Sequence, residues 1–201
     1  MTKIKFCGLT RPDDMVAANE LITDYIGFIF AAKSRRYISP DQAAALRRLL
    51  HPDIRAVGVF VQESPERVAE FLNRDVIDIA QLHGGEDETY IRILRTLTGK
   101  PIVKAFQIDS ALDIKKAEIC SADYVLLDCG AGGTGTSFDW NLAKLMHRPY
   151  FLAGGLHAEN AAEAVRTLKP FAVDVSSGIE TDGVKDREKM RIFVQEVREH
   201  T

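Results

Sequence analysis

Two patterns of hydrophobic and polar positions alternate along the chain. Short runs rich in Val, Ile and Phe alternate with segments whose charged residues recur at helical spacing. The short apolar runs predict strands at Lys3–Cys7, Tyr25–Phe30, Arg55–Val61, Ile77–His83, Pro101–Phe106, Asp123–Asp128, Pro149–Gly154 and Phe171–Ser177. The segments between and after them predict helices at Pro12–Ile22, Pro40–Leu50, Pro65–Arg74, Glu86–Thr98, Asp109–Ile119, Asp139–Met146, Glu159–Leu168 and Asp186–Glu199.

The strand–helix unit therefore recurs from one end of the chain to the other. Alternating strands and helices imply a parallel sheet that is covered by helices. Eight such units favour closure into a (β/α)8 TIM barrel over the main alternative, an open α/β sheet. No linker-like or low-complexity segment divides the chain, so residues 1–201 are predicted to form a single barrel domain.

Composition narrows the class of protein. Apolar residues make up 46% and charged residues 27% of the 201 positions, which is ordinary for a globular domain. A net charge of -3 argues against nucleic-acid and anionic-membrane binding, and no apolar stretch approaches the ~18 residues of a membrane span. The three cysteines lack CxxC spacing, and the N-terminus lacks the apolar core of a signal peptide. We therefore expect a cytoplasmic protein with reduced thiols.

Two chemically active side chains fall at predicted strand ends, where barrel enzymes place their active sites. Cys7 ends the first strand, and its thiolate is a candidate general base if nearby cations or amide dipoles lower its pKa. Lys5 shares its strand face and is one such cation. Asp128 ends the sixth strand and is a candidate general acid. The alternatives are a buried core cysteine and a loop-anchoring carboxylate.

Arg36 and His83 are candidates for substrate binding. Arg36 follows the second strand, and its guanidinium suits bidentate binding of a carboxylate, although a solvated basic loop is the alternative. His83 ends the fourth strand and either donates a hydrogen bond to substrate or caps the Gly84-Gly85 turn. No other histidine falls at a strand end, so no metal site is expected.

Glycine-rich loops follow the last three strands. The loop 130–136 includes Gly133 and lacks both the P-loop ending and the dinucleotide fingerprint, which favours a flexible active-site loop and no cofactor. Gly154-Gly155 and Ser176-Ser177-Gly178 follow the seventh and eighth strands, where many barrels bind phosphate with backbone N–H groups. A pair of tight turns is the alternative. The loops predict a small phosphorylated substrate.

Strand alternation also predicts one contact inside the barrel. Lys3, Lys5 and Cys7 share one face of the first strand, and Asp174 and Ser176 share one face of the eighth. The first and last strands are neighbours in a closed barrel. We therefore expect Lys5 to pair with Asp174, although Asp174 is also a candidate for substrate contact.

Taken together, the segments at these positions resemble the phosphoribosylanthranilate isomerase family of tryptophan biosynthesis. The resemblance spans nearly the whole chain in order. The matching segments are 5–10, 27–30, 34–37, 57–61, 81–84, 104–106, 126–128, 132–135, 138–140, 152–156, 174–180 and 183–186. The resemblance implies an Amadori rearrangement of N-(5'-phosphoribosyl)anthranilate without a cofactor.

The resemblance also implies individual roles. Asp128 would protonate the furanose ring oxygen, and Cys7 would remove the proton at C2. Arg36 would bind the anthranilate carboxylate, and the backbone around 154–155 and 176–178 would hold the phosphate.

Two other functions stay open from the sequence. One is a different phosphosugar isomerase, such as the histidine-pathway aminoaldose isomerase, which has an aspartate where Cys7 stands. The other is a non-catalytic ligand-binding barrel. The helical faces show no excess of exposed apolar residues, so a monomer is expected.

Overall fold

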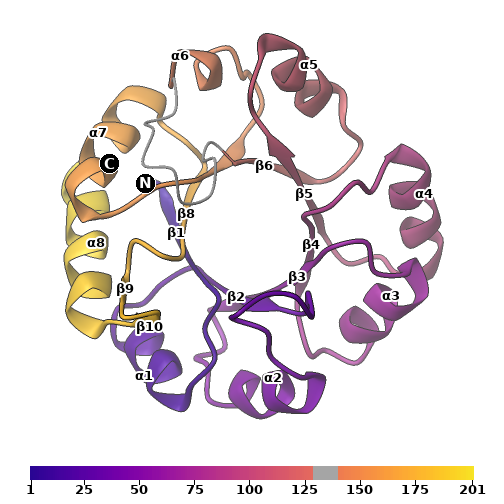
Figure 1. Cartoon of the computed structure of the whole chain (residues 1–201), viewed down its shortest axis with the longest axis horizontal. Helices are drawn as coiled ribbons and strands as arrows, with labels where there is room; N and C mark the ends of the chain where they lie inside the picture. The colour runs from indigo at the N-terminus through magenta and orange to yellow at the C-terminus, as the bar shows by residue number, and fades with distance from the viewer. Residues whose placement is uncertain (129–139) are drawn as a thin grey trace.

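Eight parallel strands close into a barrel in the computed structural model, which describes residues 1–128 and 140–201 (Figure 1). Each strand pairs with the next along the chain, and the last pairs with the first, so the predicted barrel is confirmed and the open sheet is not observed. The strands are β1 (Lys3–Cys7), β2 (Tyr25–Ile29), β3 (Arg55–Phe60), β4 (Ile79–Leu82), β5 (Ile102–Gln107), β6 (Tyr124–Asp128), β7 (Tyr150–Ala153) and β8 (Ala172–Val175).

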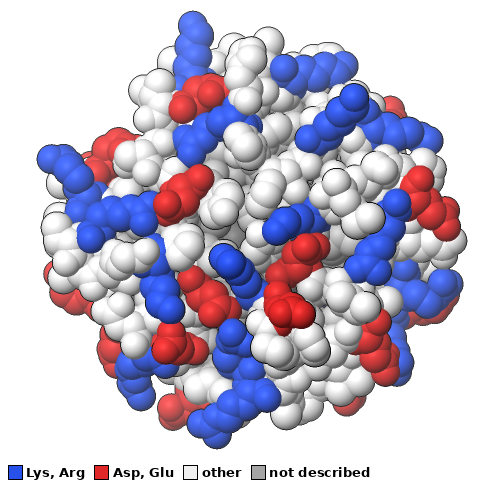
Figure 2. All heavy atoms as spheres, turned by 180° about the vertical axis from the view of Figure 1, so that it is seen from behind, with Lys and Arg blue, Asp and Glu red and all other residues white. Residues whose placement is uncertain are grey.

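Helices form a ring outside the barrel (Figure 1). They are α1 (Pro12–Glu20), α2 (Pro40–Arg47), α3 (Pro65–Asn73), α4 (Glu88–Leu97), α5 (Ala111–Ile119), α6 (Trp140–Ala143), α7 (Ala158–Leu168) and α8 (Arg187–Glu199). In the described part of the chain, none of them is long and apolar enough to span a bilayer. The face opposite that of Figure 1 carries acidic and basic side chains intermixed (Figure 2).

Local hydrogen bonds set where several helices begin. The Ser39 hydroxyl accepts from the Gln42 amide at 3.2 Å, and the Gln42 side chain accepts from the Ser39 amide at 3.0 Å. This reciprocal capping box, followed by Pro40 at the first helical position, satisfies donors that the first turn leaves free. The sequence therefore determines the start of α2 locally.

Apolar side chains divide between two layers. The larger set packs between the strands and the helices, and a second set fills the barrel interior. The interior set is Tyr25, Val57, Ile79, Val103, Ala105, Leu126, Phe151, Ala153 and Ala172. Two residues further along β4 and β8, the inward positions carry Gln81 and Asp174, both buried. The barrel interior thus changes from apolar to polar toward the carboxyl ends of the strands.

A small hairpin after β8 was not predicted. It consists of β9 (Glu180–Thr181) and β10 (Val184–Lys185), which are antiparallel. Asp182 and Gly183 between them have φ of 53° and 79°, the left-handed geometry that an Asp-Gly hairpin turn adopts. Strands of two residues are too short to produce an alternating hydrophobic pattern. The hairpin pairs Lys185 with Glu180 beside the end of β8.

Candidate active site

Cys7 and Asp128 end β1 and β6, and parallel strands of a closed barrel place both at the same end of the molecule. Cys7 is 8% exposed. Gly27 lies beside it on β2, and a Cβ atom there would approach the Cys7 Sγ to 2.8 Å and the Lys5 Nζ to 3.3 Å. The glycine therefore leaves the space that the thiol and the ammonium occupy.

The predicted pairing of Lys5 with Asp174 is confirmed. The Lys5 Nζ donates to the Asp174 Oδ2 at 2.7 Å, and the two side chains are 1% and 6% exposed. Burial lowers the pKa of Lys5, but Asp174 and Cys7 raise it by more, so the pKa lies above its ordinary value. Lys5 is therefore a buried cation beside the thiol.

The pKa of Cys7 differs from the sequence expectation. Burial raises it, and the opposing charges of Lys5 and Lys185 do not fully compensate, so the pKa lies above the ordinary thiol value. Cations do flank Cys7 as expected, but the desolvation of the thiolate outweighs them. Cys7 therefore holds its proton more tightly than an ordinary thiol, and the thiolate derived from it is a stronger base than an ordinary one.

We expect Lys5→Met to destabilise the fold by about 3–5 kcal/mol, because it leaves the buried Asp174 carboxylate without its cation. The double variant Lys5→Met/Asp174→Leu removes both charges and should recover much of that loss. Urea unfolding of the wild type, both single variants and the double variant measures this coupling. Losses that simply add would contradict it.

Glu180, on the hairpin after β8, binds two cationic side chains, those of Arg36 and Lys185. The Arg36 Nε and Nη2 donate to the two Glu180 oxygens at 2.6 and 2.8 Å, and the Lys185 Nζ donates to Oε1 at 2.7 Å. Arg36 also packs over Gly8 at the end of β1, where a Cβ atom would lie 2.5 Å from the Arg36 Cδ. Arg36 is therefore held in a fixed orientation over the end of β1, at the residue that follows Cys7 in the sequence.

Lys185 connects these side chains to Cys7. Its Nζ donates to the Ser176 carbonyl at 2.9 Å and contacts the Ser176 Oγ at 3.3 Å, and that hydroxyl donates to the Cys7 carbonyl at 3.0 Å. Burial lowers the pKa of Lys185 although Glu180 opposes the shift. Glu180 and Lys185 lie in segments that resemble the family, but the sequence predicts no role for either, and the structure pairs Glu180 with both Lys185 and Arg36. A charged residue on each side of the Asp182-Gly183 turn was the available signal.

Acid stability should depend on Glu180. Burial raises its pKa, but the hydrogen bonds and charges of Arg36 and Lys185 outweigh burial and lower the pKa from 4.5 to about 2. Its stabilisation is therefore present above the ordinary carboxyl pKa and is lost as pH falls toward about 2. We expect Glu180→Gln to be less stable than wild type near about pH 7, with a difference that shrinks toward about pH 3. Urea midpoints across this range measure it, and a constant difference would contradict it.

His83 lies between two polar side chains. Its Nε2 is 3.2 Å from the Asp128 Oδ2, and its Nδ1 is 2.9 Å from the Gln81 Nε2. The Gly84 amide donates to the Glu86 Oε2 at 2.8 Å, so Glu86 rather than His83 caps the turn. The sequence pattern predicts that the following helix begins at Glu86, but α4 begins at Glu88 because the Glu86 carboxylate is used in this loop.

The loops that follow β7 and β8, where the sequence predicts a phosphate site, contact each other. Gly154 and Gly155 have φ of 93° and 63°, which favours glycine at both positions. A Cβ atom on Gly178 would lie 2.0 Å from the Leu156 carbonyl oxygen, and Gly178 bridges to His157. Ser176 and Ser177 precede this contact. Gly133 lies outside the described residues.

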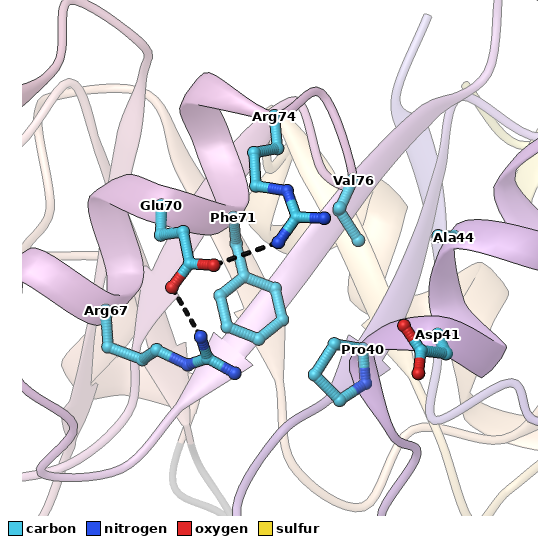
Figure 3. A pocket seen from close by; sticks show the side chains of 8 residues that line it. All are labelled: Pro40, Asp41, Ala44, Arg67, Glu70, Phe71, Arg74 and Val76. Carbon is cyan, nitrogen blue, oxygen red and sulfur yellow. Dashed lines mark hydrogen bonds and ion pairs between the residues drawn. The ribbon is translucent and has the colours of Figure 1, made fainter.

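A separate groove lies on the outer wall between α2 and α3 (Figure 3). Phe71 lines it, and the Glu70 carboxylate there pairs with Arg67 and Arg74. None of the predicted site residues borders this groove. Among the described residues, no cluster of three or more His, Cys, Asp or Glu side chains is arranged to hold a metal ion.

Comparison with known proteins identifies the family. The model described as "N-(5'phosphoribosyl)anthranilate (PRA) isomerase" matches residues 4–196. The chain belongs to this family. The resemblance inferred from the motifs is thereby confirmed, and membership makes the chain an isomerase of tryptophan biosynthesis rather than a non-catalytic barrel.

Relatives of the same family match along nearly their whole length. The N-(5'-phosphoribosyl)anthranilate isomerase of Endomicrobium trichonymphae is 43% identical over 94% of this chain and 95% of its own. That of Caldanaerobacter subterraneus is 42% identical over 98% of both. The crystal structure of the Thermotoga maritima isomerase is 34% identical, covers 99% of this chain and 100% of its own, and superposes with a TM-score of 0.90.

One matching crystal structure holds a ligand. It is a family member in complex with reduced 1-(o-carboxyphenylamino)-1-deoxyribulose 5-phosphate, 33% identical, with a TM-score of 0.88 over 99% of this chain and 100% of its own. A family member therefore binds a phosphorylated small molecule on the same fold.

Proposed function

We propose that this protein converts N-(5'-phosphoribosyl)anthranilate to 1-(2-carboxyphenylamino)-1-deoxyribulose 5-phosphate with no cofactor, using Asp128 as acid and Cys7 as base. The observation that carries the assignment is a thiol and a carboxylate at the same barrel end in a chain that matches the isomerase family from residue 4 to 196. Growth rescue of a tryptophan auxotroph that lacks this step tests it. Wild type should restore growth, and Cys7→Ala should not.

The reaction moves two protons onto the substrate and two away from it. Asp128 gives a proton to the furanose ring oxygen as the bond from that oxygen to C1 breaks, which leaves a protonated Schiff base between C1 and the anthranilate nitrogen. The Cys7 thiolate then takes the proton from C2 and produces an enolamine. Protonation at C1 and loss of the proton on the C2 oxygen give the ketone.

Arg36 is suited to bind the anthranilate carboxylate. Glu180 occupies the Nε and Nη2 side of its guanidinium, which leaves the edge formed by Nη1 and the second Nη2 hydrogen for another carboxylate. Glu180 thereby orients the plane of the guanidinium and leaves N–H donors on its other edge for the substrate.

Arg36→Met should raise KM about 10- to 100-fold with little change in kcat, because it removes charge-assisted hydrogen bonds made equally to substrate and transition state. Arg35→Met is the matched control, since the Arg35 side chain is 66% exposed and its Nη2 comes no closer than 3.4 Å to the Glu180 Oε2. Steady-state kinetics distinguish them. A large fall in kcat with an unchanged KM in Arg36→Met would contradict a binding role.

The loops after β7 and β8 supply the phosphate site in this proposal. The two loops touch at His157 and Gly178, and the backbone amides of Gly154, Gly155, Ser176, Ser177 and Gly178 would bind the phosphate there. Asp174, in contrast, lies within β8 and accepts a hydrogen bond from Lys5 inside the barrel, which supports a structural role for it.

The histidine-pathway aminoaldose is the competing substrate. The thiol at the end of β1 favours the anthranilate substrate, because the competing family has an aspartate at that position. Assays with both aminoaldoses separate the two, and turnover of the anthranilate compound alone is expected.

We also propose that the protein is a cytoplasmic monomer. One matching crystal structure contains monomers generated from the dimeric Thermotoga maritima isomerase, so a dimer exists among relatives. Light scattering coupled to gel filtration measures the mass directly, and a value near twice 22.4 kDa would contradict the monomer.

A further inference from the structure

Gln81 is a polar side chain in the wall of the barrel. It lies on β4, is 1% exposed, and is flanked in the sheet by Val59 and Val103. An amide in such surroundings costs free energy unless its polar atoms are hydrogen-bonded. Its Nε2 is 2.9 Å from the His83 Nδ1, whereas its buried Oε1 has no partner among the described residues. The contact with His83 is therefore the hydrogen bond that this side chain makes among the described residues.

The orientation of the Gln81 amide, with Nε2 rather than Oε1 toward the imidazole, decides which tautomer of His83 fits beside it. In this orientation the amide nitrogen, which only donates, faces the His83 Nδ1, so that nitrogen accepts and carries no proton. A neutral imidazole then carries its single proton on Nε2. That nitrogen is 3.2 Å from the Asp128 Oδ2, so His83 donates to the carboxylate.

The donation has a consequence for the acid. The Asp128 Oδ2 accepts a hydrogen bond from the His83 Nε2–H. A carboxyl proton on the same oxygen would point toward that hydrogen and is therefore disfavoured. When Asp128 is protonated, its proton therefore sits on Oδ1. Oδ2 keeps its hydrogen bond before and after Asp128 gives that proton up.

We propose that Gln81 and His83 are positioning residues for Asp128: Gln81 selects the His83 tautomer, and His83 selects the Asp128 oxygen that delivers the proton. The proposal rests on the proposed function. In the step itself the Oδ1–H bond breaks, the proton joins the ring oxygen, and the electron pair of the C1–oxygen bond moves to that oxygen. His83 keeps its own proton throughout and stabilises the carboxylate that remains.

Nitrogen-15 NMR of the imidazole rings tests the first half without substrate. In wild type, the His83 signals should show a protonated Nε2 and an unprotonated Nδ1, with the assignment made by loss of these signals in His83→Gln. Gln81→Glu places an acceptor against Nδ1 and should move the proton there. Gln81→Met keeps the side-chain volume, removes the donor and should leave a mixture of tautomers. A wild-type ring protonated on Nδ1 would overturn the proposal.

Kinetics test the second half. Gln81→Met and His83→Leu should each lower kcat about tenfold or more while KM stays within about threefold, because both act on the acid and not on binding. His83→Gln retains a side-chain N–H donor with reach similar to Nε2 and should keep most of the kcat that His83→Leu loses. Equal losses in the leucine and glutamine variants would overturn the proposal, as would a normal kcat in Gln81→Met with a changed tautomer.

The two proposals fail in different ways. Absence of turnover by the wild-type protein would contradict the proposed function. Normal wild-type turnover together with either adverse result above would contradict only the role given to Gln81 and His83.

Discussion

Cys7→Ala should lower kcat by about 10²- to 10⁴-fold, the range over which a positioned general base accelerates proton removal. The fold should survive, because the change deletes one sulfur atom from an 8% exposed position and the Cys7 carbonyl still accepts from Ser176. Initial rates of ketone formation measure the effect, and circular dichroism checks the fold. Cys120→Ala is the matched control, since this buried free cysteine lies at the end of α5.

The pH dependence should identify the same group. Because burial raises the pKa of Cys7, its thiolate forms on the alkaline side of the ordinary thiol value. In wild type, kcat/KM should therefore rise with pH through that ionisation, and Cys7→Ala should lack this rise. Near-wild-type activity in Cys7→Ala, or an unchanged pH profile, would remove Cys7 from the mechanism.

Asp128→Asn should lower kcat by a comparable factor of about 10²–10⁴, because the amide has no acidic proton for the ring oxygen. The substitution preserves shape, and an amide oxygen can still accept from His83. Asp123→Asn changes the residue that precedes β6, next to Arg95 and far from the rim, and should retain kcat. Steady-state kinetics of the two variants distinguish the acid from a structural carboxylate, and equal kcat values would contradict the assignment.

Much of the fold was predictable because strands buried on both sides and amphipathic helices leave different patterns in the sequence. Errors lie at element ends. The eighth strand was predicted to reach Ser177, but β8 ends at Val175 because the Ser176 carbonyl and hydroxyl are used by Lys185. The fourth strand was extended to His83 and begins only at Ile79. Such ends depend on partners far along the chain, which a local pattern does not contain.

The site was partly predictable for the same reason. Strand ends alone predicted that Cys7 and Asp128 lie at the same end of the barrel, and alternation between adjacent strands predicted the Lys5–Asp174 pair. The contact of His83 with Asp128 joins β4 to β6 across an intervening strand, so it depends on side-chain length and not on register.

Glu180 and Lys185 were not assigned a role because their position comes from a two-residue hairpin. Likewise, Gln81 stands out in the sequence as a polar residue between Ala80 and Leu82, but the role proposed for it depends on its contact with His83, which only the structure shows.

The order in which a ribosome makes this chain matters for the site. Cys7 is made before Asp174, Ser176 and Lys185, which form part of its surroundings and follow it by some 170 residues. A nascent chain lacking β8 has no neighbour for the open edge of β1, and its Lys5 has no counter-ion. Competence for the proposed catalysis should therefore appear only once β8 and the hairpin that follows it have been made, rather than grow in step with chain length.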